Sequence, residues 1–262
     1  MPLDSRALWE KLVRLRGTAV MGDHWLWCLD FDGTLVDIAP RPDAIMVPPT
    51  MVADLHRLAA QPGQTVAIVS GRTLADLRRY LGDEPDLWLS GDHGGQIMGP
   101  NFHWNYPITA RHQHRLETLC RQWIEAATSL PGVMVEPKPY SFSIHYRLAA
   151  ESVKQALYRS IRETRWPTGM VLKESHQCFE VHLSLGPTKG RAVVEIMRHL
   201  GVATTQLITV AFGDDQTDED MFLALQTGIT VRVSPAPVDT AAQYQVPNPD
   251  AVRELIHWMA AD

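Results

Sequence analysis

The sequence has few cysteines and no long hydrophobic run, and both absences narrow the class of protein. Its three cysteines, Cys28, Cys120 and Cys178, lie far apart in 262 residues and form no CxxC pair. This spacing favours reduced thiols over a disulfide framework or a zinc site, so we expect a cytoplasmic protein. No run of roughly 18 apolar residues predicts a membrane-spanning helix. The first twenty residues also lack the continuous apolar stretch of a signal peptide.

A surplus of basic residues is missing as well. The formal net charge is -6 and the sequence pI is near 6.0. Nucleic-acid-binding domains usually carry a basic surplus, so this balance argues against such a partner. The hydrophobic content of 45% is that of an ordinary globular protein. We therefore expect a protein that acts on a small molecule, with neither a nucleic acid nor a membrane as its partner. We also expect a monomer, although nothing in the composition determines the oligomeric state.

Strand-like and helix-like segments alternate at both ends of the chain. The predicted strands are Trp25–Asp30, Thr65–Val69, Leu87–Leu89, Leu207–Phe212 and Ile229–Val233. The predicted helices between and after them are Pro49–Ala60, Leu74–Leu81, Lys189–Gly201, Asp218–Gln226 and Ala251–Ala261. Such alternation predicts crossover units and a parallel sheet. We predict an α/β protein whose Rossmann-like parallel-sheet core is formed by residues 1–102 and 185–262.

The middle of the chain breaks this alternation. Residues 103–184 show one helix followed by two strands, and then the same order again. This order favours antiparallel pairing with the helices on one face, so we predict an inserted α+β domain there. The proline-rich segment 234–250 is expected to be the least regular part of the chain.

Two acids in the segment Cys28–Val36 are the most informative feature of the sequence. Asp30 and Asp32 end an apolar run and directly precede Gly33-Thr34. Alternate residues of a strand point to one face, so the two carboxylates should lie on the same side. Like charges this close need a cation or a shared proton. This suits phosphoryl transfer with Asp30 as nucleophile and Asp32 as acid and base, although a strand followed by a polar turn is the simpler reading.

Polar groups also stand near the ends of other predicted strands. Ser70 follows the second strand, Lys189 opens a helix, and Asp214 and Asp215 follow the strand that begins at Leu207. The carboxyl ends of parallel strands meet at one edge, so these groups should share a crevice with Asp30. Taken singly, each is more often a turn, a helix start or a helix cap. Together they favour a phosphatase.

Each group has a task in that reaction. Ser70 and Thr34 can donate hydrogen bonds to phosphoryl oxygens, and Lys189 supplies positive charge to the transferring group. Mg²⁺ prefers hard oxygen ligands. The ligands that we predict for it are Asp30, Asp32 through its backbone carbonyl, Asp214 and Asp215.

These motifs resemble those of the haloacid dehalogenase superfamily, which has Asp-x-Asp-x-Thr, Ser, Lys and Gly-Asp-Asp in the same order. Within it, the chain most resembles the trehalose-6-phosphate phosphatases. The resemblance rests on Leu29–Leu35, on Ser70-Gly71-Arg72, on Glu136-Pro137-Lys138 with Ser141–Arg147, and on Gly213–Phe222. It implies a Mg²⁺-dependent phosphatase that converts trehalose 6-phosphate to trehalose through an aspartyl-phosphate intermediate.

The resemblance also implies that the inserted domain is a cap that contacts the sugar. Gly71, Arg72 and His93 would bind the substrate beside Thr34 and Ser70. The residues implied to face the sugar are Glu136, Lys138, Ser141, His145, Arg147 and Glu180. The chain departs from the family at His182, where an arginine is usual. Two alternatives therefore stay open: a phosphatase of another sugar phosphate, of the sucrose-phosphate or glucosylglycerate-phosphate type, and a non-catalytic sugar-phosphate sensor.

Overall fold

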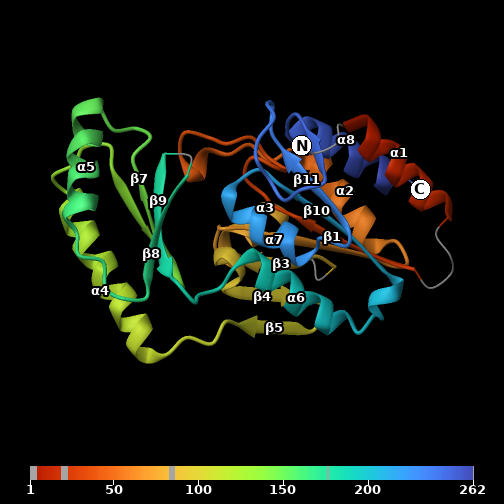
Figure 1. Ribbon diagram of the computed structural model, residues 1–262, viewed down its shortest axis with the longest axis horizontal. Helices are drawn as coiled ribbons and strands as arrows, with labels where there is room; N and C mark the ends of the chain where they lie inside the picture. Colours follow the sequence, from red (N-terminus) through yellow and green to blue (C-terminus); the bar gives the residue numbers. More distant parts are fainter. Residues whose placement is uncertain (1–4, 19–22, 83–85, 176, 262) are drawn as a thin grey trace. The chain divides into compact units, whose positions relative to one another are not determined.

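The computed structural model describes residues 5–18, 23–82, 86–175 and 177–261 (Figure 1). The chain divides into two compact units. The first unit contains the chain up to Ala39, Ile45–Asn105 and the chain from Thr188 onward. The second unit contains Pro40–Ala44 and Tyr106–Pro187.

The first unit is built on one large sheet. In spatial order its strands are β12 (Tyr244–Val246), β11 (Ile229–Val233), β10 (Leu207–Gly213), β1 (His24–Leu29), β2 (Gln64–Val69), β3 (Trp88–Gly91), β4 (Gln96–Gly99) and β5 (Phe102–Asn105). The strands from β12 to β3 run parallel, and β4 and β5 continue the sheet as an antiparallel pair. The first strand of the chain thus lies in the middle of the sheet, next to β10.

Helices cover both faces of this sheet. Alternate side chains of β1 explain why: Trp25, Trp27 and Leu29 belong to one buried cluster, and Leu26 and Cys28 to the other. The first cluster is completed by α1 (Ser5–Thr18), α2 (Pro49–Ala60), α3 (Leu74–Leu81) and α8 (Pro249–Ala260). The second is completed by α6 (Lys189–Leu200) and α7 (Glu219–Ala224). A strand that is buried on both faces leaves only its ends for chemistry.

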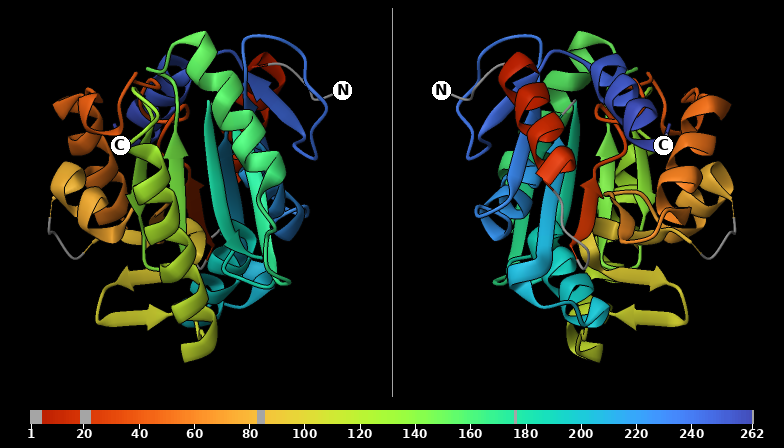
Figure 2. Two further views of the ribbon diagram at one scale, coloured as in Figure 1. Left: turned by 90° about the vertical axis from the view of Figure 1, so that its left-hand side faces the viewer. Right: turned by 90° about the vertical axis from the view of Figure 1, so that its right-hand side faces the viewer.

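The second unit contains a four-stranded antiparallel sheet. Its strands, in spatial order, are β6 (Met134–Pro137), β7 (Ser141–His145), β9 (Cys178–Leu183) and β8 (Met170–Ser175). Helices α4 (Ala110–Ala127) and α5 (Glu151–Glu163) pack on one face of this sheet (Figure 2, left view). Phe142, Ile144, Phe179 and Val181 are the strand residues of that buried cluster.

The predicted α/β class with a mainly parallel core is confirmed. Residues 103–105, which we had assigned to the inserted domain, lie instead in β5, because they pair with β4. The proline-rich segment 234–250 contains β12, which pairs with β11, and its last two residues begin α8. Within the described ranges, every helix is too short or too polar to cross a lipid bilayer.

Candidate active site

The polar residues expected at strand ends gather at one edge of the large sheet. Asp30 follows β1, Ser70 follows β2 and Asp214 follows β10, while Lys189 is the first residue of α6. Backbone hydrogen bonds extend the strand pairing to this edge, since Asp30 N donates to Phe212 O at 3.0 Å. The carboxyl ends of parallel strands therefore supply the site.

Lys189 lies at the centre of this group. Its Nζ is 2.6 Å from Asp30 Oδ1 and 2.7 Å from Asp218 Oδ1, and its side chain is only 3% exposed. Thr188 caps the start of α6 by accepting a hydrogen bond from Arg191 N, which fixes the turn that carries Lys189. The two carboxylates raise the pKa of Lys189, although burial by itself would lower it. The ammonium group therefore stays charged in a buried place.

Asp30 is held through both carboxylate oxygens. Oδ1 faces Lys189, and Oδ2 accepts a hydrogen bond from Thr34 Oγ1 at 3.0 Å. Burial raises the pKa of Asp30 well above its ordinary value, Lys189 opposes this shift, and the charges of Asp218 and Asp214 add to it. One ammonium group does not neutralise three neighbouring acids. A further cation would favour the ionised form of Asp30.

Three acids converge closely enough to share one metal ion. One oxygen each from Asp30, Asp214 and Asp218 lies within 4.8 Å of the other two. The backbone makes room for them, since a Cβ on Gly33 would lie 2.1 Å from Asp214 Oδ2. Gly33 also has φ +82°, which favours glycine. Hard carboxylate oxygens around a surplus of negative charge are a donor set that fits Mg²⁺.

The sequence pattern places Asp218 with Asp214 and Asp215, either in the crevice or as a helix cap, but Asp218 was not among the predicted metal ligands or catalytic residues. It is completely buried, and its Oδ2 accepts a hydrogen bond from Asp215 N at 2.9 Å. Burial raises the pKa of Asp218, against the opposing charge of Lys189. Its position four residues after Asp214 was the available signal. Its position three residues after Asp215 also fits a helix cap, and the structure contains this cap: Asp215 and Asp218 form a capping box around η4 (Gln216–Asp218).

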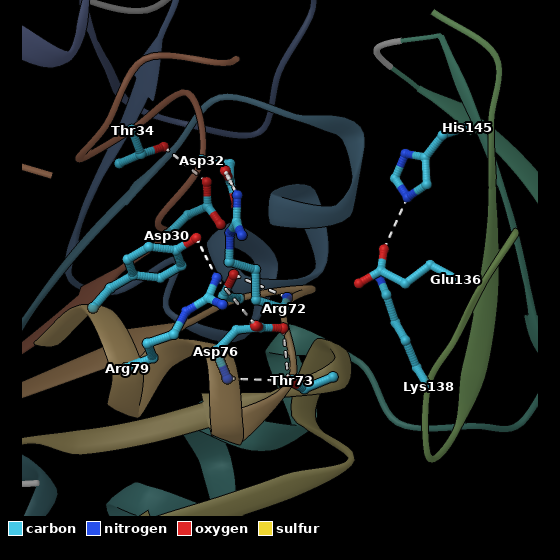
Figure 3. Close-up of polar contacts among 12 residues, drawn as sticks. Asp30, Asp32, Thr34, Arg72, Thr73, Asp76, Arg79, Glu136, Lys138 and His145 are labelled. Carbon is cyan, nitrogen blue, oxygen red and sulfur yellow. Dashed lines mark hydrogen bonds and ion pairs between the residues drawn. The ribbon is translucent and has the colours of Figure 1, made fainter. Parts of the chain in front are cut away.

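Asp32 and Arg72 form a bidentate ion pair. Arg72 Nε lies 2.7 Å from Asp32 Oδ2, and Arg72 Nη2 lies 2.7 Å from Asp32 Oδ1 (Figure 3). The Arg72 side chain is 11% exposed and that of Asp32 is 34% exposed. Two parallel hydrogen bonds of this kind fix the plane of a carboxylate as well as its position. The guanidinium group of Arg72 thus binds a neighbouring acid, and its expected contact with the substrate stays a prediction.

Ser70, Gly71 and His93 lie together beside this pair. Ser70 is buried and its Oγ accepts a hydrogen bond from Arg72 N at 3.1 Å. A Cβ on Gly71 would lie 2.4 Å from His93 Nε2, so the imidazole packs directly over this glycine. Asp92 and His93 both adopt positive φ angles, of 48° and 54°. Positive φ in consecutive non-glycine residues is unusual and is enriched where a site must hold a fixed shape.

The residues expected to face a sugar lie in the second unit. Direct cross-strand partners share a face of a sheet, so the pairs Glu136–Ser143 and Ser143–Glu180 place these three residues on the same side. His145 and Ser141 lie on that side too, because they alternate with Ser143 along β7. This face is opposite to the one that packs against α4 and α5.

Polar side-chain contacts organise this polar face. His145 Nε2 is 2.8 Å from Glu136 Oε2, and Lys138 Nζ is 3.4 Å from Glu180 Oε1 (Figure 3 shows the first pair). Arg147 lies two residues beyond the end of β7 and is half-buried. His182, at the position where we noted a departure, pairs with Ser141 and lies on the same face. The face is therefore rich in groups that can hydrogen-bond to hydroxyls.

Comparisons with known proteins point to one family. A model of the trehalose-phosphatase family matches residues 28–250. A trehalose-phosphate phosphatase of Mycobacterium ulcerans is 33% identical over 238 residues, which cover 88% of this chain and 60% of that protein. A probable trehalose-phosphate phosphatase of Sinorhizobium fredii is 30% identical over 247 residues, which cover 91% of this chain and 88% of that protein. The chain thus spans 60% of the length of the Mycobacterium relative and 88% of the Sinorhizobium one.

A solved structure shares the fold. The C-terminal domain of the Candida albicans trehalose-6-phosphate phosphatase aligns with a TM-score of 0.78 over 99% of this chain and 98% of that one. The two sequences are 23% identical, so this likeness concerns the fold alone.

Proposed function

The chain belongs to the trehalose-phosphatase family, and we propose that it hydrolyses trehalose 6-phosphate to trehalose and phosphate. The observation that carries the reaction type is the environment of Asp30, a buried carboxylate held by Thr34 and Lys189 beside two further acids. Such a group suits nucleophilic attack on phosphorus. The choice of substrate is supported by the family and by the names of the relatives.

In the first half of the proposed reaction, a carboxylate oxygen of Asp30 attacks the phosphorus. The new O–P bond forms as the bond from phosphorus to the sugar oxygen breaks. Asp32 donates its proton to that leaving oxygen, which gives a neutral sugar and an aspartyl-phosphate. Lys189 lies 2.6 Å from Asp30 and stabilises the negative charge that spreads over the phosphoryl oxygens. Thr34 and Ser70 orient that group by hydrogen bonds.

In the second half, water attacks the aspartyl-phosphate. Asp32, now ionised, takes a proton from this water as its oxygen bonds to phosphorus. The bond between Asp30 and phosphorus breaks, phosphate leaves, and both acids return to their starting forms. One carboxylate that serves as acid and then as base is economical for a two-step hydrolysis.

Mg²⁺ is part of this proposal. Asp30 and Asp214 would hold it together with the backbone carbonyl of Asp32, and Asp218 lies close enough to be a further ligand. Asp215 stays a predicted ligand although its carboxylate also caps η4. When bound, the ion would neutralise charge on the phosphoryl oxygens and favour the ionised form of Asp30. The polar face of the second unit, with Glu136, Lys138, Ser141, His145, Arg147 and Glu180, is proposed to recognise the sugar hydroxyls.

Phosphate release from a substrate panel tests the proposal. Purified protein would be assayed with trehalose 6-phosphate, sucrose 6-phosphate, glucosylglycerate phosphate and glucose 6-phosphate, each with Mg²⁺ and with EDTA. We expect the highest kcat/KM for trehalose 6-phosphate and no turnover in EDTA. Asp30→Asn is the inactive control, and Asp37→Asn, at an 81% exposed carboxylate, is its matched neutral variant.

The other outcomes are equally informative. Equal turnover of several sugar phosphates, or a preference for sucrose 6-phosphate, would replace the substrate and keep the reaction type. Tight binding of trehalose 6-phosphate without phosphate release would indicate a sensor. Turnover by Asp30→Asn at more than about one hundredth of the wild-type rate would remove Asp30 from the role of nucleophile.

A further inference from the structure

The bidentate contact between Arg72 and Asp32 involves the residue that the proposed reaction uses first as an acid and then as a base. Both oxygens of Asp32 are engaged at 2.7 Å, one by Nε and one by Nη2 of the same guanidinium group (Figure 3). Asp32 lies beyond the end of β1, its backbone forms an isolated bridge with Val36, and its side chain is 34% exposed. A carboxylate in such a place would otherwise rotate freely between several conformations.

Two aromatic rings also contact the guanidinium group of Arg72. Its central carbon lies 5.4 Å from the centre of the Tyr80 ring and 5.8 Å from that of Phe31. Phe31 is completely buried, and the two rings stack on each other with their centres 6.1 Å apart. Arginine side chains stack on aromatic faces in this way, which restricts their rotation. The orientation of the guanidinium plane is therefore set by two aromatic rings on one side and by the Asp32 carboxylate on the other.

This geometry bears on what Arg72 does. The family resemblance placed it among the substrate-binding residues, where its charge would meet the phosphoryl group. In the structure, its Nε and Nη2 bind the carboxylate of Asp32, and Lys189 is the cation that contacts Asp30. An arginine that binds a carboxylate through two parallel bonds gives up this pair only at a cost.

We propose that Arg72 is a positioning residue that holds the carboxylate of Asp32 in place for its proton transfers. The inference rests on the proposed function, because it needs Asp32 to be the acid and base. Each carboxylate oxygen of Asp32 has a second lone pair besides the one that accepts a hydrogen bond from Arg72. In the first half-reaction Asp32 must start protonated. The proton sits on the free lone pair of one carboxylate oxygen and passes to the sugar oxygen as the bond between that sugar oxygen and phosphorus breaks. In the second it can take one from the attacking water.

A role in proton transfer and a role in phosphate binding predict different dependence on the leaving group. An alkoxide such as that of a sugar leaves only if it is protonated, whereas 4-nitrophenolate leaves readily without a proton. The value of kcat/KM reports the steps up to release of the leaving group. Loss of a positioned Asp32 should therefore lower kcat/KM for the sugar phosphate much more than for 4-nitrophenyl phosphate. Loss of a phosphate-binding cation should lower both alike.

Three variants make the test specific. Arg72→Met removes the guanidinium group and keeps much of the side-chain volume. Arg72→Lys keeps the positive charge but cannot form two parallel hydrogen bonds to Asp32. Arg79→Met is the matched control, because Arg79 stacks on the same Tyr80 ring at 4.7 Å and is 59% exposed. Circular dichroism and thermal unfolding establish that each variant is folded. Arg72→Lys keeps the test available should Arg72→Met fail to fold.

We expect kcat/KM for trehalose 6-phosphate to fall about 100-fold in Arg72→Met, mostly through kcat, and less than about tenfold for 4-nitrophenyl phosphate. Arg72→Lys should lie between, and Arg79→Met should match the wild type on both esters. An equal fall on both esters, carried by KM, would overturn the proposal and make Arg72 a phosphate ligand. Wild-type rates in Arg72→Lys and Arg72→Met would overturn it as well.

Failure of the proposed function is recognised separately, in the wild-type protein. If the wild type hydrolyses another alkyl phosphate in place of trehalose 6-phosphate, the substrate assignment fails, and the same ratio of alkyl to aryl ester still decides the role of Arg72. A wild type that hydrolyses neither ester class overturns both the phosphatase and the positioning role.

Discussion

Lys189 Nζ lies 2.6 Å from Asp30 Oδ1, although 159 residues separate the two in the chain. The contact joins the start of α6 to the end of β1. Because Asp218 contacts the same ammonium group at 2.7 Å, three segments that are distant in sequence meet at one buried charge. The stability of this region and its chemistry therefore depend on the same atoms.

Replacement of Lys189 by methionine should lower both the stability of the fold and the catalytic rate. Two buried carboxylates would lose their counter-charge, which in proteins costs about 3–5 kcal/mol of unfolding free energy. Urea unfolding measures this, with Lys154→Met as the control, at an exposed contact in which Lys154 Nζ donates to Gln177 Oε1. Adding Asp218→Asn to the variant should recover part of the loss, because one uncompensated charge disappears. An unfolding free energy within about 1 kcal/mol of the wild type would contradict this account.

Addition of Mg²⁺ should stabilise the folded protein even without substrate. A ligand that binds only the native state raises the melting temperature, by about 5–10 °C at a hundred times its dissociation constant for a domain of this size. Differential scanning fluorimetry with and without MgCl₂ measures the shift. Asp214→Asn should abolish it, and Asp37→Asn should retain it. A shift of equal size in Asp214→Asn would show that the ion binds elsewhere.

The three thiols should be inert in the native protein. Burial raises the pKa of Cys28 and Cys120, and burial together with the charge of Glu180 raises that of Cys178 to about 12. Only the thiolate reacts readily, so we expect almost no labelling by DTNB at pH 8 and three labelled groups per chain after unfolding in urea. Cys178→Ser separates the partly exposed thiol from the two buried ones. Rapid native labelling that persists in this variant would contradict the burial of Cys28 and Cys120.

The histidine at the start of β1 should make the fold less stable in mild acid. Burial lowers the pKa of His24 below 6.5, and its Nε2 lies 2.9 Å from Thr65 Oγ1. The unfolded chain binds the proton first as the pH falls through 6.5, so stability is present above this pH and is lost below it. His24→Asn should lose less stability than the wild type between pH 7.5 and pH 5. His103→Asn, at an exposed histidine of β5, should follow the wild type.

The elements that carry the candidate site could be predicted because their signals are local. Buried parallel strands need continuous apolar residues, so Trp25–Leu29 and the strand from Leu207 were recognisable without their neighbours. Helix periodicity did the same for α2 and α3, whose observed bounds match the predicted ones. The polar residues that directly follow such strands were then candidates by position alone.

The short edge strands could not be recognised in this way. Strand β12 has only three residues and lies in a proline-rich segment, and it exists because Tyr244–Val246 finds the open edge of β11. Strands β4 and β5 form a short hairpin whose pairing depends on β3 beside it. Propensity within a few residues does not contain that information.

The sequence by itself determined which residue types stand at the ends of the central strands, because a strand buried on both faces must be apolar until it ends. Only the tertiary structure decided their partners: Asp218 with Lys189, and Arg72 with Asp32. A charge selects its partner by distance and by the loss of water around it, and both arise only when separate segments of the chain pack together.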